Sequence, residues 1–242
     1  MFSNRYIFIY ATILVVCSAA ILTFAAIGLK PMQDKNIRVE KMQQLLGAVG
    51  IESTAKDAED LFNKYFIEQH AVNAEGKVVG SVVNGKQTLG TINPFELNTK
   101  KQLALYKTHD ASACLPVYVC LKDGKKSYVV PVIGNGLWGA IWGNIAFADD
   151  LNTIVGVNFD HKSETPGLGA EIATIAFQKQ FYGKSIFEAG EFKSVEVKKR
   201  ADKANPHQVD AISGGTITSN GVSKMIKDCL TFYIPYFNSI KK

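Results

Sequence analysis

The chain begins with one long apolar run and continues with segments in which apolar and polar positions alternate. Residues 7–27 carry no charged side chain, and 18 of these 21 residues are apolar. A helix of that length rises about 31 Å, which matches the ~30 Å hydrocarbon core of a bilayer. The run predicts an N-terminal membrane anchor over residues 1–30, with residues 7–27 in contact with lipid. A cleaved signal peptide and a lipoprotein site at Cys17 are the alternatives.

Helical spacing follows the anchor, and strand patterns follow the helices. Apolar residues three and four positions apart predict helices over 36–49 and 53–66, which we interpret as a helical connector over 31–75. β-rich runs, split by turn residues at 122–125 and 149–152 that indicate hairpins, occupy 78–83, 116–121, 128–133, 144–147 and 153–159. A helix over 170–182, a strand over 192–198 and a final helix over 219–232 complete the pattern.

These elements lack the regular strand-helix alternation of a doubly wound fold. They predict instead an α+β domain over residues 76–242, in which a mainly antiparallel β-sheet packs against helices. One N-terminal transmembrane helix precedes this domain.

Composition and charge exclude several classes of function. The net charge is +5, and the basic residues are scattered among acids, with the densest cluster at 198–200. Basic and aromatic residues do not alternate, so no nucleic-acid partner is predicted. Four cysteines without a CxxC pair and four isolated histidines do not predict a metal site. Neither a Ser-His-Asp set nor a paired acid and base is recognisable, so no catalytic residue is predicted.

Three glycine-containing loops carry the candidate chemistry. Residues 210–219, DAISGGTITS, lie immediately before the final helix, where glycines and free helix amides suit a phosphate. Residues 161–169, HKSETPGLG, join a strand to a helix, and residues 134–139, GNGLWG, end a strand with an aliphatic and an aromatic residue that could hold a flat ring. Taken alone, each loop is more simply explained by a structural role, as a helix cap, a turn or a core tryptophan respectively.

Together, and in this order, the loops resemble the FMN-binding domain found in the C-subunit of the sodium-pumping NADH:quinone oxidoreductases and in the G-subunit of the Rnf electron-transport complexes. The family pattern of Asp, two variable residues, Ser or Thr, Gly, Ala and Thr is matched by Asp210, Ser213, Gly214 and Thr216, with Gly215 in place of Ala. The ETPGLG string is matched throughout at 164–169. The GLW element and the single anchor are more similar to the sodium-pump protein than to the Rnf protein.

This resemblance implies that FMN is joined to the Thr216 side chain as a phosphoester, by a separate magnesium-dependent flavin transferase that uses FAD. Thr218 is the rival hydroxyl, and Asp210 and Ser213 are expected to position the phosphate or to assist the transferase. Contacts with the flavin are expected from the remaining residues of the three loops, namely Gly214, Gly215, Glu164, Thr165, Leu168, Gly169, Leu137 and Trp138.

The resemblance also implies a function. The protein would relay single electrons through FMN between partner subunits, which would themselves oxidise NADH and reduce ubiquinone during sodium transport. It would lie in the bacterial cytoplasmic (inner) membrane as a single-pass protein with its C-terminal domain in the periplasm, although the charges flanking the anchor leave its orientation open. The alternatives are an Rnf-type G-subunit and a membrane-anchored binding or scaffold module without a redox role.

Overall fold

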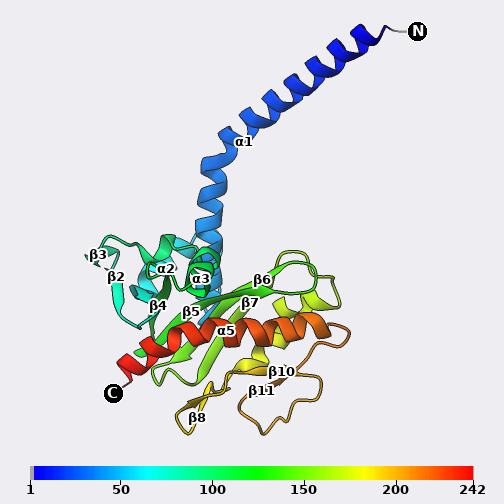
Figure 1. The fold of residues 1–242 in the computed structure, drawn as a ribbon. Coiled ribbons are helices and arrows are strands. Elements are labelled where there is room, and N and C mark those ends of the chain that lie inside the picture. The colour runs from blue at the N-terminus through cyan, green and yellow to red at the C-terminus, as the bar shows by residue number, and fades with distance from the viewer. Residues whose placement is uncertain (1–2, 242) are drawn as a thin grey trace. The chain divides into compact units, whose positions relative to one another are not determined.

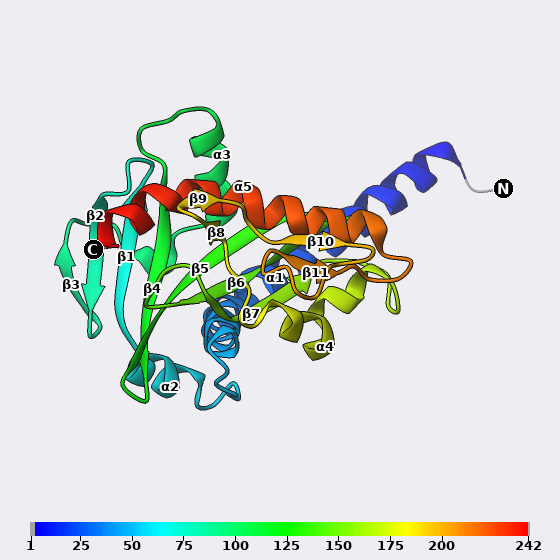
Figure 2. The ribbon, with the colours of Figure 1, turned by 90° about the horizontal axis from the view of Figure 1, so that it is seen from below.

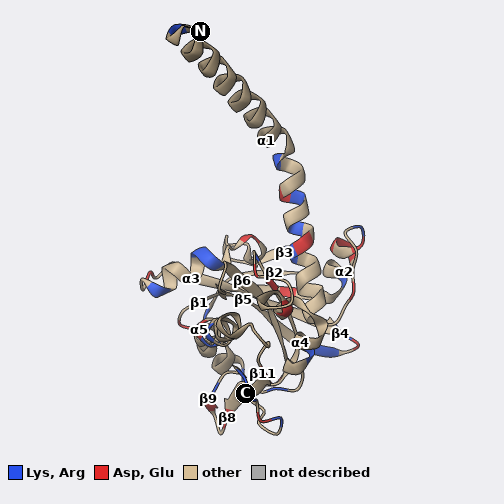
Figure 3. Cartoon of the chain, turned by 90° about the vertical axis from the view of Figure 1, so that its right-hand side faces the viewer, with Lys and Arg blue, Asp and Glu red and all other residues tan. Residues whose placement is uncertain are grey.

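The computed structural model describes residues 3–241; residues 1, 2 and 242, at the outer ends of the expected anchor and domain, lie outside this range. The chain forms two compact units that meet in sequence between Lys41 and Met42. In the first unit, the long helix α1 (Asn4–Ala48) has no charged residue between Arg5 and Lys30 and is long and apolar enough to be a candidate membrane span (Figure 3).

The second unit is built on one antiparallel sheet with the strand order β3-β2-β1-β4-β5-β6-β7 (Figure 1). Its strands are β1 (Phe66–Asn73), β2 (Val78–Val83), β3 (Lys86–Leu89), β4 (Cys114–Lys122), β5 (Lys125–Asn135), β6 (Ala140–Ala148) and β7 (Ile154–His161). Both predicted hairpins are present: Lys122 pairs with Lys125 across a two-residue turn, and the Asp150 carboxylate accepts hydrogen bonds from the 152 and 153 amides in the second turn.

One face of the sheet is covered by the last helix, α5 (Thr216–Ile240), which runs across the strands (Figures 1 and 2). Its apolar positions recur at helical spacing, so one stripe is buried against the sheet. Close approach to β5 is possible because Gly134 faces Met225, whose Cβ would lie 2.7 Å from a Cβ placed on the glycine. Burial raises the pKa of Cys229, on the same stripe, to about 11, and its protonated thiol donates to the Ile133 carbonyl at 3.3 Å.

The opposite face is covered by the end of α1 within the second unit and by α2 (Ala58–Tyr65). Leu45 and Leu46 are fully buried there, and Phe62 stacks on Phe66 with ring centroids 4.7 Å apart. Gly156 of β7 leaves room for the Ala48 carbonyl, which a side chain at 156 would strike. The central strands of the sheet, such as β4 and β6, are therefore mostly buried, and this packed core carries the loops at its ends.

Smaller elements fill the remaining connections. The helical ones are η1 (Pro94–Glu96), α3 (Thr99–Lys107), η2 (Gly169–Ala173), α4 (Ile175–Gln178) and η3 (Lys179–Phe181). The extended ones are the antiparallel pair β8 (Phe187–Glu188) and β9 (Glu191–Phe192), and the parallel pair β10 (Glu196–Lys198) and β11 (Gln208–Asp210).

The predicted α+β class, with a mainly antiparallel sheet and packed helices, is confirmed, whereas several details are corrected. The helical connector predicted over 31–75 is wrong in its last part, because β1 belongs to the sheet and pairs with both β2 and β4. The helix predicted over 170–182 consists of three short helical pieces. The strand predicted over 192–198 is interrupted by Ser194, which has φ +66°. The final helix begins at Thr216, three residues earlier than predicted, and ends later.

Candidate functional site

The three loops singled out by the sequence meet at one pocket of about 230 Å³ beside the start of α5. One loop connects β5 to β6, one follows β7, and one leads from β11 into α5. The pocket is lined by Leu137, Trp138, Glu164, Thr165, Leu168, Gly169, Gly214, Gly215, Thr216, Ile217 and Thr218. Because β5 and β7 both run antiparallel to β6, the β5-β6 loop and the loop after β7 lie at the same end of the sheet. The start of α5 lies beside both loops.

Four of the residues that line this pocket are large, apolar and exposed. Trp138 is 65% exposed, Ile217 56%, Leu137 50% and Leu168 42%. Large apolar side chains gathered around a pocket indicate a surface that binds another apolar group. A flat aromatic ring system would fit such a lining.

The start of α5 supplies the complementary polar part of the site. Its N-cap is Gly215, which has no side chain to cap the helix, and its first backbone hydrogen bond runs from the Ser219 N–H to the Gly215 carbonyl at 2.9 Å. The N–H groups of residues 216–218 precede that bond and, with the helix dipole of a 25-residue helix, favour an anion. Gly214, with φ +74°, lets the chain turn into the helix. Phosphate chemistry therefore fits this end of the pocket.

The two candidate hydroxyl groups of α5 differ sharply. Thr216, the first residue of the helix, is exposed, whereas Thr218 is only 2% exposed. The Thr218 hydroxyl donates to Glu164 Oε2 at 2.6 Å, so it already has a partner. Of the two, the Thr216 side chain combines access from solvent with a place on the pocket wall.

Glu164 lies at the floor of the pocket and is 4% exposed. Its Oε1 accepts a hydrogen bond from the backbone N–H of Trp138 at 2.8 Å, while Oε2 accepts the bond from Thr218. Its own backbone N–H donates to His161 Nδ1 at 3.2 Å. Both carboxylate oxygens are thus engaged by groups of the protein.

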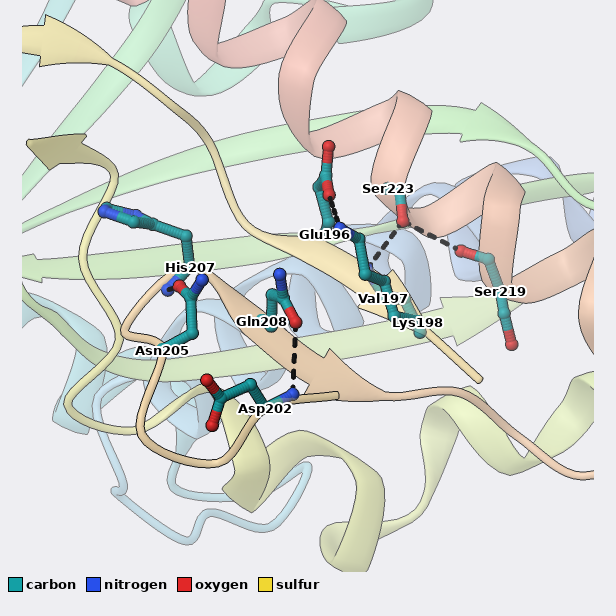
Figure 4. A network of polar contacts seen from close by, with 9 residues as sticks. All are labelled: Glu196, Val197, Lys198, Asp202, Asn205, His207, Gln208, Ser219 and Ser223. Carbon is teal, nitrogen blue, oxygen red and sulfur yellow. Dashed lines mark hydrogen bonds and ion pairs between the residues drawn. The ribbon is translucent and has the colours of Figure 1, made fainter. Parts of the chain in front are cut away.

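Two hydroxyl groups of α5 hold segments that precede the helix, namely β10 and the loop after β11; Figure 4 shows the first of these contacts, between Ser223 and Val197. Ser223 Oγ accepts the Val197 N–H of β10 at 2.8 Å, and Ser219 Oγ accepts the Ile212 N–H at 3.1 Å. Ser219 ends the 210–219 motif but received no role from it, and Ser223 lies outside all three motifs; their spacing of four residues on a helix face was the available signal. The motifs also missed Ile217, an apolar residue off the buried stripe of α5.

Two predicted site residues lie outside the pocket lining. Asp210 Oδ1 accepts the Ala201 N–H at 3.1 Å, and its own N–H donates to Gln180 Oε1 at 2.9 Å. Ser213 is exposed on the turn before Gly214. The structure brings together the other predicted residues: Leu137, Trp138, Glu164, Thr165, Leu168, Gly169, Gly214, Gly215, Thr216 and Thr218. Within residues 3–241, no group of three or more His, Cys, Asp or Glu side chains is placed to hold a metal ion.

Comparisons with known proteins agree with this geometry. Residues 136–231, which include residues 136–139 of the first loop, the other two loops and α5 as far as Thr231, match the model of a family described as the FMN-binding domain. The C-subunit of the Na+-translocating NADH-quinone reductase of Neisseria meningitidis serogroup B is 33% identical, over 99% of this chain and 95% of that protein. Its counterpart from Haemophilus ducreyi is 34% identical, over 88% of this chain and 83% of that protein.

Two solved structures share the fold. The C-subunit of the Na+-translocating NADH-quinone reductase from Parabacteroides distasonis has a TM-score of 0.75 and 36% sequence identity, and the match covers 86% of this chain and 96% of that one. NqrC from Shewanella oneidensis has a TM-score of 0.64 and 27% identity, over 84% of this chain and 97% of its own.

Proposed function

This chain belongs to the C-subunit family of the Na+-translocating NADH-quinone reductases, and from that premise we propose that it carries FMN covalently on Thr216 and relays single electrons between partner subunits. Membership makes it an electron-transfer subunit of an oxidoreductase complex, with an FMN-binding domain. The observation that carries the proposal is the exposed Thr216 hydroxyl at an uncapped helix start, beside a pocket lined by exposed apolar side chains.

Thr216, rather than Thr218, is the residue suited to attachment. An attacking hydroxyl must reach both the donor and the active site of a transferase, and Thr218 is buried and already donates to Glu164. In the proposed transfer, the Thr216 oxygen forms a bond to the FMN phosphorus of FAD. The diphosphate bond breaks, AMP leaves, and the hydroxyl proton passes to a base of the flavin transferase.

Different residues would hold the two ends of the cofactor. The N–H groups of residues 216–218 and the turn at Gly214 and Gly215 would hold the phosphate. Leu137, Trp138, Leu168 and Ile217 would cover the ring and exclude water from it, and Thr165 on the same wall would supply polar contacts. Bound FMN supplies a group that takes up and releases electrons one at a time. Because the phosphoester fixes only the tail, these noncovalent contacts would set the reduction potential.

Asp210 and Ser213 fit a role outside the pocket. Asp210 holds the 199–203 turn against β11, so its carboxylate would shape the surface that precedes Thr216. Ser213 is exposed beside the attachment residue. We assign both to recognition by the transferase.

The location and the partners follow from the same premise. Residues 1–30 would anchor the chain in the cytoplasmic membrane through the candidate span of α1, with residues 7–27 in contact with lipid. The FMN-binding domain would lie on the periplasmic side, where covalent attachment prevents loss of the cofactor. Its partners would be the flavin transferase and the other subunits of the reductase. Those subunits would oxidise NADH and reduce the quinone.

Attachment is tested with the full chain, expressed with and without a flavin transferase. Denaturing electrophoresis under ultraviolet light should show a fluorescent band only with the transferase, and peptide mass spectrometry should place the added FMN on Thr216. Thr216→Ala should abolish the fluorescence. Thr231→Ala, which removes an exposed hydroxyl elsewhere on α5, should keep it.

Two outcomes would contradict attachment of FMN to Thr216. Fluorescence retained by Thr216→Ala would show that another residue carries the flavin. A wild-type chain that stays dark after expression with an active transferase would reject covalent flavin and favour a binding or scaffold role.

A further inference from the structure

Trp138 lines the pocket, but its side chain is too exposed to hold the residue in place by packing. The indole is 65% exposed, and the preceding Leu137 is 50% exposed. Burial therefore contributes little to holding either residue. Whatever fixes their place must act on the backbone of the β5-β6 loop.

Two adjacent residues of the loop after β7 hold that backbone from both sides. Glu164 Oε1 accepts the Trp138 N–H at 2.8 Å, and the Ser163 hydroxyl donates to the Trp138 carbonyl at 2.8 Å. Glu164 Oε2 accepts the Thr218 hydroxyl at 2.6 Å. The pair Ser163-Glu164 thus joins the Trp138 peptide to the first turn of α5.

The glycines of these loops make room for the same two side chains. A Cβ on Gly136 would lie 2.5 Å from Glu164 Oε1, and one on Gly139 would lie 2.8 Å from Ser163 Oγ. A Cβ on Gly169 would collide with Glu164 Oε2 and lie 2.5 Å from Thr218 Oγ1. The backbone conformations at 136, 139 and 169 do not themselves require glycine. Glycine is needed there because the Ser163 and Glu164 side chains occupy the space of a Cβ.

In the part of the chain that the structure describes, Glu164 is held by hydrogen bonds and not by an ion pair. Both oxygens accept, and no Lys, Arg or His side chain among residues 3–241 forms an ion pair with it. A buried carboxylate is costly unless donors replace water, and short O–H to carboxylate bonds are the strong kind. Removal of the carboxylate would leave the buried Thr218 hydroxyl and the part-buried Trp138 N–H without this acceptor.

We propose that Ser163 and Glu164 form a clamp whose task is to position Trp138 over the cofactor pocket and to couple it to the first turn of α5 through Thr218. Glu164 is then a positioning residue and makes no contact with the flavin. The role assigned to the clamp rests on the proposed function, because the object of the positioning is the flavin ring.

The clamp itself is tested without flavin, in the full-length Thr216→Ala chain in detergent micelles. Glu164→Ala should make the amide hydrogen of Trp138 exchange about 10- to 100-fold faster, as expected when a hydrogen bond to a charged group is lost. Glu164→Gln should have a smaller effect, because its carbonyl can still accept from Trp138 while the Thr218 hydroxyl turns to accept from the amide. Glu171→Ala is the matched control: its partly exposed loop carboxylate accepts the Gly167 N–H, and exchange at Trp138 should not change.

A second arm uses the flavin-loaded chain with Thr216 intact. Thr218→Val removes the donor to Oε2, and should change the reduction potential and increase the mobility of the flavin measured by fluorescence anisotropy. Thr218→Ser keeps the hydroxyl and should restore both to wild-type values. This rescue distinguishes loss of positioning from loss of packing.

The outcomes separate the clamp from the proposed function. Unchanged exchange at Trp138 in Glu164→Ala and in Ser163→Ala would overturn the clamp even if wild type is fully flavinylated. Should Glu164→Ala fail to fold, Ser163→Ala and the Thr218 pair decide the matter, and wild-type behaviour of both Ser163→Ala and Thr218→Val would overturn it. A dark wild-type chain would instead reject the proposed function and leave the exchange experiment interpretable.

Discussion

The two ends of α5 differ in which side chains they bury. At the C-terminal end, Phe232, Tyr233 and Phe237 are buried against the sheet, and the Tyr233 hydroxyl donates to the Pro116 carbonyl at 3.2 Å. At the N-terminal end, the apolar Ile217 is exposed while the polar Thr218 is buried. The usual arrangement, with apolar groups inside and polar groups outside, is reversed where the pocket lies. Fold stability should therefore come from one end of the helix and flavin chemistry from the other.

The largest effect on stability is expected at the C-terminal end. Phe237 is fully buried and packs edge-on against Phe147 at 5.4 Å. Phe237→Ala should lower the free energy of unfolding by about 3–5 kcal/mol. Ile217→Ala, at the exposed end, should change it by less than about 0.5 kcal/mol. Chemical denaturation of the full chain in micelles measures both, and similar losses for the two variants would remove the contrast between the ends.

A smaller loss, combined with a loss of function, is expected for Gly169→Ala. Its methyl group would displace the buried Glu164 carboxylate, so about 1–3 kcal/mol should be lost. Flavin incorporation should fall as well, and in-gel fluorescence per unit of protein measures it. Gly167→Asn is the control, because a Cβ there meets open space and Asn tolerates its φ of +76°. Full stability and full incorporation in Gly169→Ala would contradict the close packing described around Glu164.

Trp138→Ala should change function without changing stability. Since the indole is 65% exposed, the free energy of unfolding should shift by less than about 0.5 kcal/mol. If Trp138 covers the flavin as we propose, the flavin should become more exposed, which would raise its fluorescence and move the reduction potential. Spectroelectrochemical titration measures the potential, and an unchanged potential and emission would place Trp138 away from the ring.

The smallest effect is expected on the pH dependence of stability, through His70, which contacts the C-terminal end of α5. Burial lowers the pKa of His70 below its ordinary value of 6.5; Glu68 opposes this shift, and the charge of Lys126 adds to it. His70 Nδ1 lies 2.9 Å from the Tyr236 hydroxyl of α5, so the neutral ring is the form that the fold favours.

Because its pKa is lower in the folded chain than in the unfolded chain, His70 contributes stability that is present above pH ~6.5 and is lost as the pH falls through the folded-state value. Thermal unfolding at about pH 7.5 and about pH 5.5 should show a smaller difference in His70→Gln than in wild type. An equal pH dependence in the two chains would exclude His70 as its source.

Sequence patterns located the three loops that line the pocket better than they located the strands of the sheet. The three loops were recognised because glycines, prolines and hydroxyl residues at fixed spacing are local signals. The strand β1, FIEQHAVN, was missed because its residues do not alternate cleanly between apolar and polar. It is a strand because β2 and β4 flank it and pair with it. The start of α5 was placed three residues late because Gly214 and Gly215 hide the helix boundary.

The amino-acid sequence determined the membrane-length apolar run, the α+β class, the order of the three loops and the two threonines near the start of the last helix, since each depends on residues close together in the chain. Only the tertiary structure decided that Thr216 is exposed while Thr218 is buried, and that Asp210 faces Ala201 instead of the pocket. It also decided that Ser163 and Glu164 hold Trp138. These facts depend on contacts between residues up to 54 positions apart. Strand pairing in the sheet brings such residues together, and the local sequence pattern does not encode these contacts.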